Sequence, residues 1–412
     1  MRILFLNPIG ALGGAERSLL DIFSALRELE PGWQLFLLAG ADGPLLSEAS
    51  KLGVVSEVLP MPDELLVLGD SAHQGKFATL LRLLSGAKKS LSYAKLLRAR
   101  IKALQPDVIH SNGIKFHLLT RLAKLKSRAS APVPAPVPVI WHIRDFIGAR
   151  PLMKRALRWA APAAKLAIAN SEATAIDARS VLKNLPVRAV LNGIDVNHFS
   201  PGPARTDLLD QLSGLFTAPP DTLRVGLLAS YARWKGQDVL LKAAAQVLSE
   251  QHCPPVRFYI VGGPIYKTQG SQFSLAELQK LARDLNLPPD RIGFIPFQNE
   301  PLEIYRALDI VVHASSQPEP FGRTIAEAMS CARAVIATQA GGARELFTDN
   351  SDALGVPLDD APALAAAIAR LLADKNLRQQ LSAQARRTAQ ARFSLQRLGR
   401  DMRNIFTACR TP

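Results

Sequence analysis

The sequence has little cysteine, and its cysteines form no metal-binding pattern. Its 412 residues include only Cys253, Cys331 and Cys409, which lie far apart and at no ligand-like spacing. An odd number of scattered thiols excludes the disulfide framework of a small secreted domain. We therefore expect three ordinary thiols in a reducing cytoplasm.

Long hydrophobic runs are also missing. No apolar stretch reaches the ~18 residues of a membrane-spanning helix, and the nearest, residues 159–169, is interrupted by Pro162 and Lys165. The apolar start Ile3–Leu6 is too short for a secretion signal, so we expect it to be a strand. Because 48% of the residues are hydrophobic, extensive disorder is excluded as well.

Acidic residues are scarce in residues 71–168, where 19 Lys and Arg accompany only Asp107 and Asp145. The segment carries +17 in a chain whose net charge is +15. Such an excess predicts a polyanionic partner, namely a membrane surface, nucleic acid or a phosphate-bearing substrate. Nucleic acid is excluded from our prediction because no zinc finger or aromatic strand motif accompanies the charge. Basic residues lie beside apolar stripes in four helical segments, which fits either anionic lipid or ordinary solvated helix faces: residues 77–84, 91–104, 116–125 and 152–159.

Strand-like and helix-like stretches alternate along the whole chain. Apolar runs rich in branched residues predict strands at residues 3–6, 35–38, 54–59, 108–110, 139–142, 166–169, 187–191, 223–228, 256–261, 291–295, 310–313 and 334–337. Helical periodicity fills most of the intervals. The alternation predicts an α/β fold with parallel sheets covered by helices on both faces.

Turn-forming residues around 200–222 predict two tandem Rossmann-like, doubly wound domains, residues 1–205 and 206–412. From Ala361 onward the pattern is helical, and the last helix has the option of packing back on the first domain. The proline-rich residues 131–138 predict an extended loop. Since ligands bind at the carboxyl ends of parallel strands, we expect a site in a cleft between the domains.

The segment from Glu319 to Met329 carries the sharpest chemical signal. Two carboxylates, Glu319 and Glu327, flank a Pro-Phe-Gly turn and the start of a helix near Thr324. Helix N-termini favour phosphate, and Gly322 allows the backbone to approach a ligand. The pattern suits a sugar nucleotide, although a proline-rich loop with a dipole-compensating Glu327 explains the same residues.

Taken together, the motifs resemble those of retaining glycosyltransferases of the GT-B fold, close to glycosyltransferase family 4. The matching segments keep the order and spacing of that family: Gly13-Gly14-Ala15-Glu16, Val108–Asn112, Trp141–Asp145, Asn170-Ser171-Glu172, Asn192–Asp195, Trp234–Leu241, Glu319 to Glu327, and Ala340–Glu345.

The resemblance implies donor-binding and catalytic roles in the second domain. Glu319 matches the carboxylate near the transferred sugar, and Glu327 the one that binds the ribose. Lys235 matches a lysine on the diphosphate, but Ser230 stands where the family has an arginine. Whether Arg233 replaces that arginine stays open. The backbone from Phe321 to Thr324 is implied to hold the diphosphate, which involves Phe321, Gly322, Arg323 and Thr324.

In the first domain, the resemblance assigns His142 to the reacting sugar, either as a hydrogen-bond acceptor or to stabilise developing positive charge. The resemblance also implies acceptor or phosphate contacts for four residues, His110, Asn112, Arg144 and Asp145. It implies a flexible loop near both substrates at Gly13 and Gly14. We expect His313, which ends a strand of the second domain, to be a core residue.

The implied reaction transfers a sugar from a nucleoside-diphosphate sugar to an acceptor hydroxyl with retention of anomeric configuration. The implied setting is cell-envelope polysaccharide or lipid-linked glycan synthesis, in the cytoplasm or peripherally at the inner face of the membrane. The donor is a substrate and no cofactor is implied. No Asp-X-Asp triplet or metal-ligand cluster occurs, so we expect activity without metal.

Two other classes remain open. A sugar-nucleotide epimerase would share the fold and the donor site, whereas a nicotinamide dehydrogenase would want Gly-X-Gly-X-X-Gly, which Gly10-Ala-Leu-Gly13-Gly14 fails to supply. The third hypothesis is a non-catalytic component that binds a sugar nucleotide. It remains open because Ser230 stands where the family has an arginine. The sugar, the base, the acceptor and the oligomeric state are not determined by the sequence.

Overall fold

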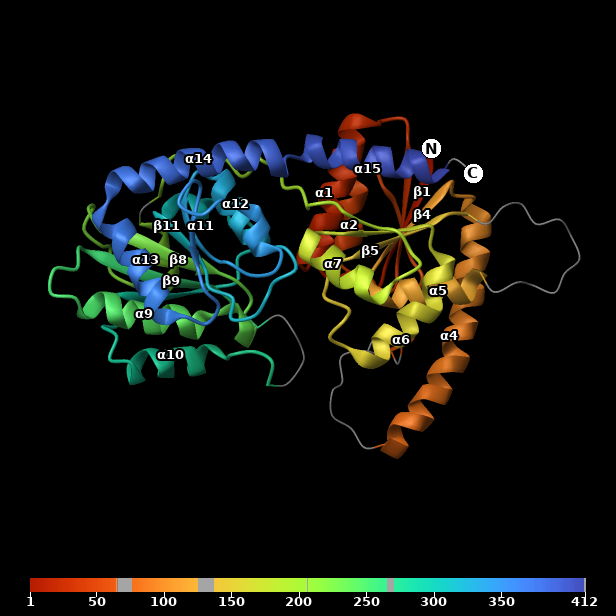
Figure 1. Cartoon of the computed structure of the whole chain (residues 1–412), viewed down its shortest axis with the longest axis horizontal. Coiled ribbons are helices and arrows are strands. Elements are labelled where there is room, and N and C mark those ends of the chain that lie inside the picture. The colour runs from red at the N-terminus through yellow and green to blue at the C-terminus, as the bar shows by residue number, and fades with distance from the viewer. Residues whose placement is uncertain (64, 66–75, 125–136, 206, 265–269, 411–412) are drawn as a thin grey trace, which may run out of the picture. The chain divides into compact units, whose positions relative to one another are not determined.

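The computed structural model describes every residue except 64, 66–75, 125–136, 206, 265–269 and 411–412. Within it the chain forms two compact units (Figure 1). The first unit comprises Met1–Gly193 and the C-terminal helix α15 (Leu395–Arg410), and the second comprises Ile194–Ser394. The sequence-based boundary at 205/206 therefore differs from the structural one, because Phe199 and Ser200 are hydrogen-bonded to residues of the second unit. Residues 131–136 of the predicted proline-rich loop lie outside the described residues.

The first unit contains a parallel sheet of seven strands in the order β3-β2-β1-β4-β5-β6-β7. Alternate residues of β1 enter different cores, since Ile3 and Phe5 belong to one cluster and Leu4 and Leu6 to the other. This is the two-residue periodicity of a strand buried on both faces. The strands are β1 (Arg2–Asn7), β2 (Gln34–Ala39), β3 (Val55–Val58), β4 (Val108–Asn112), β5 (Val139–Ile143), β6 (Leu166–Ala169) and β7 (Val187–Ala189).

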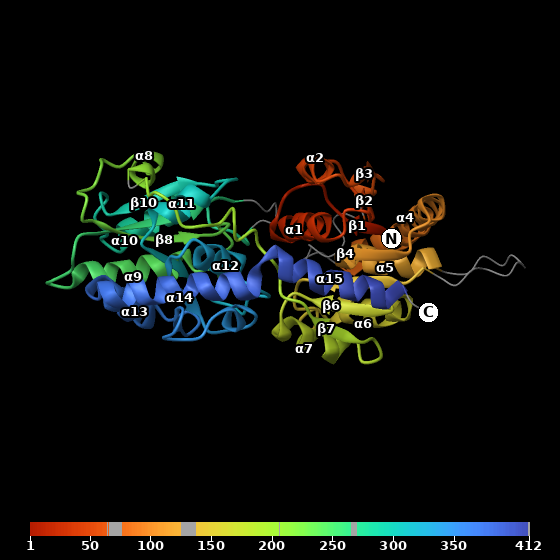
Figure 2. The same cartoon turned by 90° about the horizontal axis from the view of Figure 1, so that it is seen from above.

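Helices cover both faces of this sheet. On one face, Met402 and Phe406 of α15 pack with Phe23 of α1 and Phe5 of β1, and α1 and α15 lie side by side (Figure 1, Figure 2). On the other face, Tyr93, Phe116 and Leu157 contribute to the second core from three further helices. The helices are α1 (Gly14–Leu29), α2 (Pro44–Lys51), α4 (Lys76–Leu104), α5 (Ile114–Lys124), α6 (Pro151–Ala160), η1 (Ala161–Ala163) and α7 (Glu172–Val181).

The second unit has a parallel sheet of six strands in the order β10-β9-β8-β11-β12-β13. In both sheets the strand order reverses beside the first strand, which creates a switch point next to β1 and next to β8. The strands are β8 (Leu223–Leu228), β9 (Val256–Gly262), β10 (Ile292–Pro296), β11 (Ile310–His313), β12 (Ala334–Thr338) and β13 (Leu354–Val356). The predicted α/β architecture is confirmed, and β13 is a short edge strand that the sequence pattern missed.

A core cluster of the second unit lies between its sheet and helices α9, α10 and α13, and Leu381 of α14 also belongs to it. Leu240, Leu278 and Leu364 represent these helices in the cluster. The helical elements are α8 (Leu208–Ser213), η2 (Arg233–Lys235), α9 (Gln237–Ser249), α10 (Leu275–Asp284), α11 (Leu302–Ala307), α12 (Arg323–Ser330), η3 (Ala343–Leu346), α13 (Ala361–Ala373) and α14 (Lys375–Phe393).

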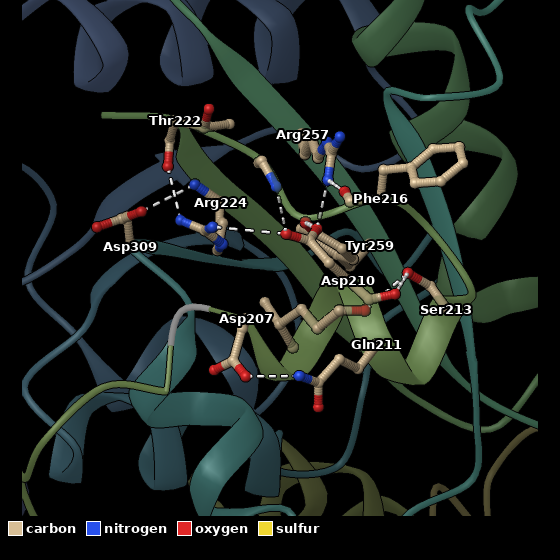
Figure 3. A network of polar contacts seen from close by, with 12 residues as sticks. Asp207, Asp210, Gln211, Ser213, Phe216, Thr222, Arg224, Arg257, Tyr259 and Asp309 are labelled. Carbon is tan, nitrogen blue, oxygen red and sulfur yellow. Dashed lines mark hydrogen bonds and ion pairs between the residues drawn. The ribbon is translucent and has the colours of Figure 1, made fainter. Parts of the chain in front are cut away.

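A buried polar network fastens α8 to the sheet of the second unit (Figure 3). The fully buried Asp210 carboxylate accepts hydrogen bonds from Arg257 Nη1 at 2.6 Å, Tyr259 Oη at 2.5 Å and the Ala218 backbone N–H at 2.9 Å. Arg224 Nη2 lies 3.7 Å from the same carboxylate. Burial raises the pKa of Asp210, but these donors outweigh burial and leave the pKa below its usual value.

The described residues of the predicted basic segments fall on helices of the first unit. Residues 77–84 and 91–104 belong to the single helix α4, residues 116–124 to α5, and residues 152–159 to α6, while residue 125 lies outside the described residues. On α4, Leu91 is 48% exposed and Leu96 56%, and on α6, Leu152 is 79% and Trp159 49% exposed. Among the helices that the structure describes, none is both long enough and apolar enough to cross a bilayer.

Candidate active site

Three ionisable side chains meet at the carboxyl ends of the neighbouring strands β8 and β11. Lys235 follows β8 and its Nζ donates to Glu319 Oε1, while His313, at the end of β11, contacts Glu319 Oε2 through Nε2. Ser315 Oγ donates to the same Oε2 at 3.1 Å. Burial raises the pKa of Glu319, but the charge of Lys235 and the His313 contact outweigh it and hold the pKa far below its ordinary value. Glu319 is therefore a carboxylate.

The backbone places Lys235 beside Glu319 through a close approach. Gly236, which follows Lys235, adopts φ +77°, and a Cβ there would lie 1.8 Å from the Ala314 carbonyl oxygen. Only glycine fits this position. The Lys235 ammonium also lies 4.2 Å from the centre of the Trp234 ring, which adds a cation–π contact to the ion pair.

The backbone of Glu319 is fixed from the opposite side. The Gly342 N–H donates to the Glu319 carbonyl at 2.7 Å, and Glu319 forms an isolated parallel bridge with Gly341. The Ala340–Glu345 motif therefore positions the first carboxylate of the Glu319 to Glu327 motif. Pro318 and Pro320 flank Glu319 and keep it out of a helix, as the sequence predicted.

The turn after Glu319 leads directly into α12. Gly322 is the N-cap at φ +98°, no side chain caps the helix, and α12 begins at Arg323, one position before the predicted Thr324. The N–H groups of a first helical turn and the helix dipole make such a start favourable for an anion. The Phe321 side chain is buried and packs edge-on against Phe393, so only its backbone is available to a ligand.

Glu327 lies on α12 with both oxygens engaged. Its Oε2 accepts from Tyr305 Oη at 2.8 Å and its Oε1 from Arg323 Nε at 2.6 Å, and the residue is only 6% exposed. Burial, followed by the charge of Glu327, raises the pKa of Tyr305 far above its usual value. Tyr305 is a site residue that the sequence did not indicate, because it comes from α11.

Arg233 is drawn toward α10 and not toward Glu319. Its Nη2 lies 2.6 Å from Glu277 Oε1, its Nε donates to the Gly270 carbonyl at 3.0 Å, and its guanidinium lies 4.4 Å from the Phe273 ring centre. Together with the Ser274 cap, this pairing lowers the pKa of Glu277 to about 2. The replacement of the missing arginine by Arg233 stays a prediction, and a diphosphate would have to compete with Glu277 for it.

His313 is buried, as the sequence predicted. In addition to Glu319 it contacts Thr338 Oγ1 through Nδ1 at 3.2 Å and Ser315 Oγ at 3.3 Å. The sequence did not indicate that polar groups from the segment after β11 and from the end of β12 converge on its ring. Its position at a strand end was the only signal in the sequence.

In the first unit, buried histidines gather at β4 and β5. His142 Nδ1 and His110 Nε2 lie 3.2 Å apart, and the His117 ring stacks on Trp141 at a centroid distance of 4.8 Å. Burial lowers the pKa of His110 and of His142 far below the usual value, and the charge of Arg144 adds to the effect. Burial also lowers the pKa of His117 to about 3. All three rings are therefore neutral at physiological pH.

Of these residues, His117 and His142 line a pocket of about 240 Å³ at the carboxyl end of the sheet. The described residues offer no hydrogen-bond partner to His142 Nε2, although this atom is buried. A buried polar atom without a partner is costly, and a ligand hydroxyl would satisfy it. Four of the predicted residues line the pocket, namely Asn112, His142, Arg144 and Asp145. Lys115 and His117 line it as well, although the sequence did not indicate them.

A chain of amides orients Arg144 beside the pocket. Arg144 Nε donates to Asn112 Oδ1 at 2.6 Å, and Asn112 Nδ2 donates to Asn7 Oδ1 at 2.6 Å. Asn192 Oδ1 accepts from Arg144 Nη1 at 3.3 Å. Asp145 is half exposed and forms an ion pair with Arg150 at 3.5 Å. The structure thus brings His110, His142, Asn112 and Arg144 together, as their strand-end positions predicted.

The glycine pair after β1 lies at the start of a helix. Helix α1 begins at Gly14, and Gly13 is its N-cap. The Gly13 N–H donates to Glu16 Oε2 at 3.1 Å, and Asn7 Nδ2 lies 3.3 Å from Glu16 Oε1. The expectation of a loop at both glycines is wrong for Gly14, because this capping interaction starts the helix earlier.

Two family models match the chain, one in each half. A model described as Glycosyltransferase Family 4 matches residues 12–198, and one described as Glycosyl transferases group 1 matches residues 216–388. The fold and these matches define a two-unit α/β glycosyltransferase architecture of the GT-B type. The chain belongs to the glycosyltransferases, with a family 4 first half and a group 1 second half.

Individual relatives agree with this assignment. D-inositol 3-phosphate glycosyltransferase of Geodermatophilus obscurus is 31% identical over 300 residues, 71% of this chain and 61% of that protein. The enzyme of that name from Corynebacterium urealyticum is 29% identical over 253 residues, 60% of this chain and 58% of the relative. The chain thus spans about three fifths of the length of these relatives.

Among solved structures, Anabaena HepE in complex with UDP and glucose matches with a TM-score of 0.75. It is 25% identical, and the match covers 98% of this chain and 99% of that chain. Sucrose-phosphate synthase of Thermosynechococcus elongatus, at 19% identity and a TM-score of 0.74, shares the fold.

Proposed function

We propose that this chain transfers a sugar from a nucleoside-diphosphate sugar to an acceptor hydroxyl and retains the anomeric configuration. The observation that carries the proposal is the Lys235–Glu319 pair beside the uncapped start of α12. A fixed ammonium and a helix N-terminus suit a leaving diphosphate, and an adjacent ionised carboxylate suits sugar hydroxyls. UDP is the first nucleotide to test, since the related HepE structure holds UDP and glucose.

The proposed step breaks the bond between the anomeric carbon and the diphosphate oxygen. The electron pair leaves with the diphosphate, and positive charge develops on the sugar ring. The acceptor oxygen then bonds to the same carbon from the same face, and its proton passes to the departing phosphate. Lys235 and the α12 N-terminus stabilise the charge on the leaving group, which is where preorganised electrostatics contribute most.

The first unit is proposed to bind the acceptor in the pocket beside His142. The neutral ring offers its Nε2 to a hydroxyl, and Arg144 supplies a positive charge for an anionic group of the acceptor. An acceptor that is lipid-linked or part of an envelope glycan fits the proposal, as does a cytoplasmic location. Transfer of the sugar to an acceptor would distinguish a glycosyltransferase from an epimerase, which needs no acceptor.

We expect the first unit to bind anionic vesicles at low salt. Lys154 and Arg155 accompany the exposed Leu152 and Trp159 on α6, and each basic residue near an anionic surface contributes about 1 kcal/mol. Co-sedimentation with phosphatidylglycerol vesicles should be strong at low ionic strength, weak at 0.5 M salt and weakened about tenfold or more by replacing Lys154 and Arg155 with Glu. Zwitterionic vesicles are the control, and absence of binding to anionic vesicles at low salt would remove the membrane from the account.

Glu327→Ala should weaken donor binding by about tenfold or more, because a charge-assisted hydrogen bond contributes roughly 1.5–3 kcal/mol. Calorimetry with UDP and UDP-sugars, run in EDTA, measures this affinity and tests metal independence together. Glu303→Ala, which removes a half-exposed carboxylate paired with Arg306 on α11, is the control and should bind normally. An unchanged donor affinity in Glu327→Ala would count against the ribose assignment, and donor binding only without EDTA would refute metal independence.

A further inference from the structure

We propose that His313, oriented by Thr338, is a positioning residue that reserves one oxygen of Glu319 for the transferred sugar. The inference rests on the proposed function. It concerns His313, a residue that has no role in the donor site implied by the family resemblance. His313 lies at the carboxyl end of β11 and Thr338 at that of the adjacent β12.

The two oxygens of Glu319 have different partners. Oε2 receives His313 Nε2 and Ser315 Oγ, and Oε1 receives Lys235 Nζ. An ionised carboxylate has about two acceptor positions on each oxygen. Oε2 is therefore saturated by the protein, whereas Oε1 keeps one position for a ligand hydroxyl next to the Lys235 ammonium.

Thr338 determines the orientation of the His313 ring. A neutral imidazole that donates from Nε2 carries its lone pair on Nδ1. The Thr338 hydroxyl lies 3.2 Å from Nδ1, so in this tautomer it can donate to that lone pair and hold the ring in the orientation that Glu319 requires. The arrangement resembles the orientation of a ligating side chain by an outer hydrogen bond.

Because the two oxygens of Glu319 have different partners, we expect different residues to govern recognition of the diphosphate and of the sugar of the donor. Lys235 serves the diphosphate, so loss of His313 should leave binding of a bare nucleoside diphosphate almost unchanged. Without His313, Glu319 can turn away from the sugar, and the additional affinity of the sugar nucleotide over its nucleoside diphosphate should disappear. A residue with only a structural role would weaken both ligands alike.

The test compares calorimetric affinities for UDP, GDP and ADP with those for their glucose, galactose and mannose conjugates. For the pair that the wild type prefers, His313→Leu should lower the ratio of sugar-nucleotide to nucleotide affinity by about tenfold. His313→Gln keeps a donor near the Nε2 position and should restore most of the ratio. Thr338→Val should lower the ratio about threefold, and Thr222→Val, a buried threonine before β8, is the matched control.

The possible results distinguish a failure of the His313 role from a failure of the proposed function. If the wild type prefers a sugar nucleotide and His313→Leu and Thr338→Val keep that preference, the role of His313 is overturned and the proposed function stands. Equal loss of both ligands, or a wild type that binds the nucleotide without any sugar preference, overturns the role as well. A wild type that binds none of the ligands overturns the proposed function itself. Should His313→Leu fail to fold, His313→Gln and Thr338→Val decide the question.

Discussion

Lys235→Ala should lower the rate of nucleoside-diphosphate release by about 10²–10³-fold, the range for loss of one preorganised electrostatic group. Departure of the diphosphate builds negative charge, and Lys235 is a partly buried cation that pairs with Glu319 and lies over the Trp234 ring. In the variant, Glu319 keeps the donors His313 and Ser315, so we expect the unit to stay folded. The rate is measured on the donor that binds the wild type, with the unfolding temperature determined in parallel.

A matched control variant, Lys242→Ala, distinguishes the specific role of Lys235 in the reaction from the loss of one positive charge. Lys242 forms an exposed i,i+4 pair with Asp238 on α9, and Lys242→Ala should turn over the donor at the wild-type rate. A Lys235→Ala protein that keeps nearly the wild-type rate would refute the phosphate role of Lys235. A large loss of unfolding temperature in Lys235→Ala would show that the ion pair serves the fold.

Asp210→Ala should lower the free energy of unfolding of the second unit by about 3–5 kcal/mol. The substitution leaves Arg257 and Arg224 buried, with their side chains only 9% and 3% exposed, and without the carboxylate that neutralises them. It also removes the acceptor of Tyr259 and of the Ala218 N–H. Because an unpaired buried charge costs more than a lost surface contact, the effect should exceed that of an ordinary substitution. Chemical denaturation measures it.

Asp207, close to Asp210 on the chain and visible in Figure 3, is the control because it contacts Gln211 at the surface. Asp207→Ala should change stability by no more than about 0.5 kcal/mol. Since the folded pKa of Asp210 is depressed, its contribution is complete above the unfolded value of about 3.9 and is lost as the pH falls toward the folded value. Equal stabilities of Asp210→Ala and Asp207→Ala would contradict the role of the network.

Most of the sheet structure could be predicted because parallel strands buried on both faces are continuous apolar runs. Leu166–Ala169, Leu223–Leu228 and Ile310–His313 have the same limits in the sequence prediction and in the structure. The three-residue edge strand β13 was missed because Leu354–Val356 is too short to show periodicity. Gly14 was assigned to a loop although it is the first residue of α1, because Glu16 caps the helix through a backbone contact that spacing alone does not reveal.

The site could be predicted where one motif carries several functional residues. Glu319, Gly322 and Glu327 share a short segment, so their relation follows from local geometry. His313, Thr338 and Tyr305 come from other strand ends and helices, and only the folded sheet brings them to the two carboxylates. Arg233 was judged by its distance along the chain from Lys235, but the side chain pairs with Glu277 of α10, far away in sequence.

The most direct test of the central claim is thermal unfolding against UDP, GDP, ADP, their common sugar conjugates and NAD, all in EDTA. A ligand at about 100 times its dissociation constant adds roughly 2.7 kcal/mol, which raises the unfolding temperature by several degrees in a unit of this size. We predict a rise with one nucleoside diphosphate and its sugar conjugate and no rise with NAD. No rise with any nucleotide, or a rise with NAD alone, would contradict the claim that the second unit binds a nucleotide sugar.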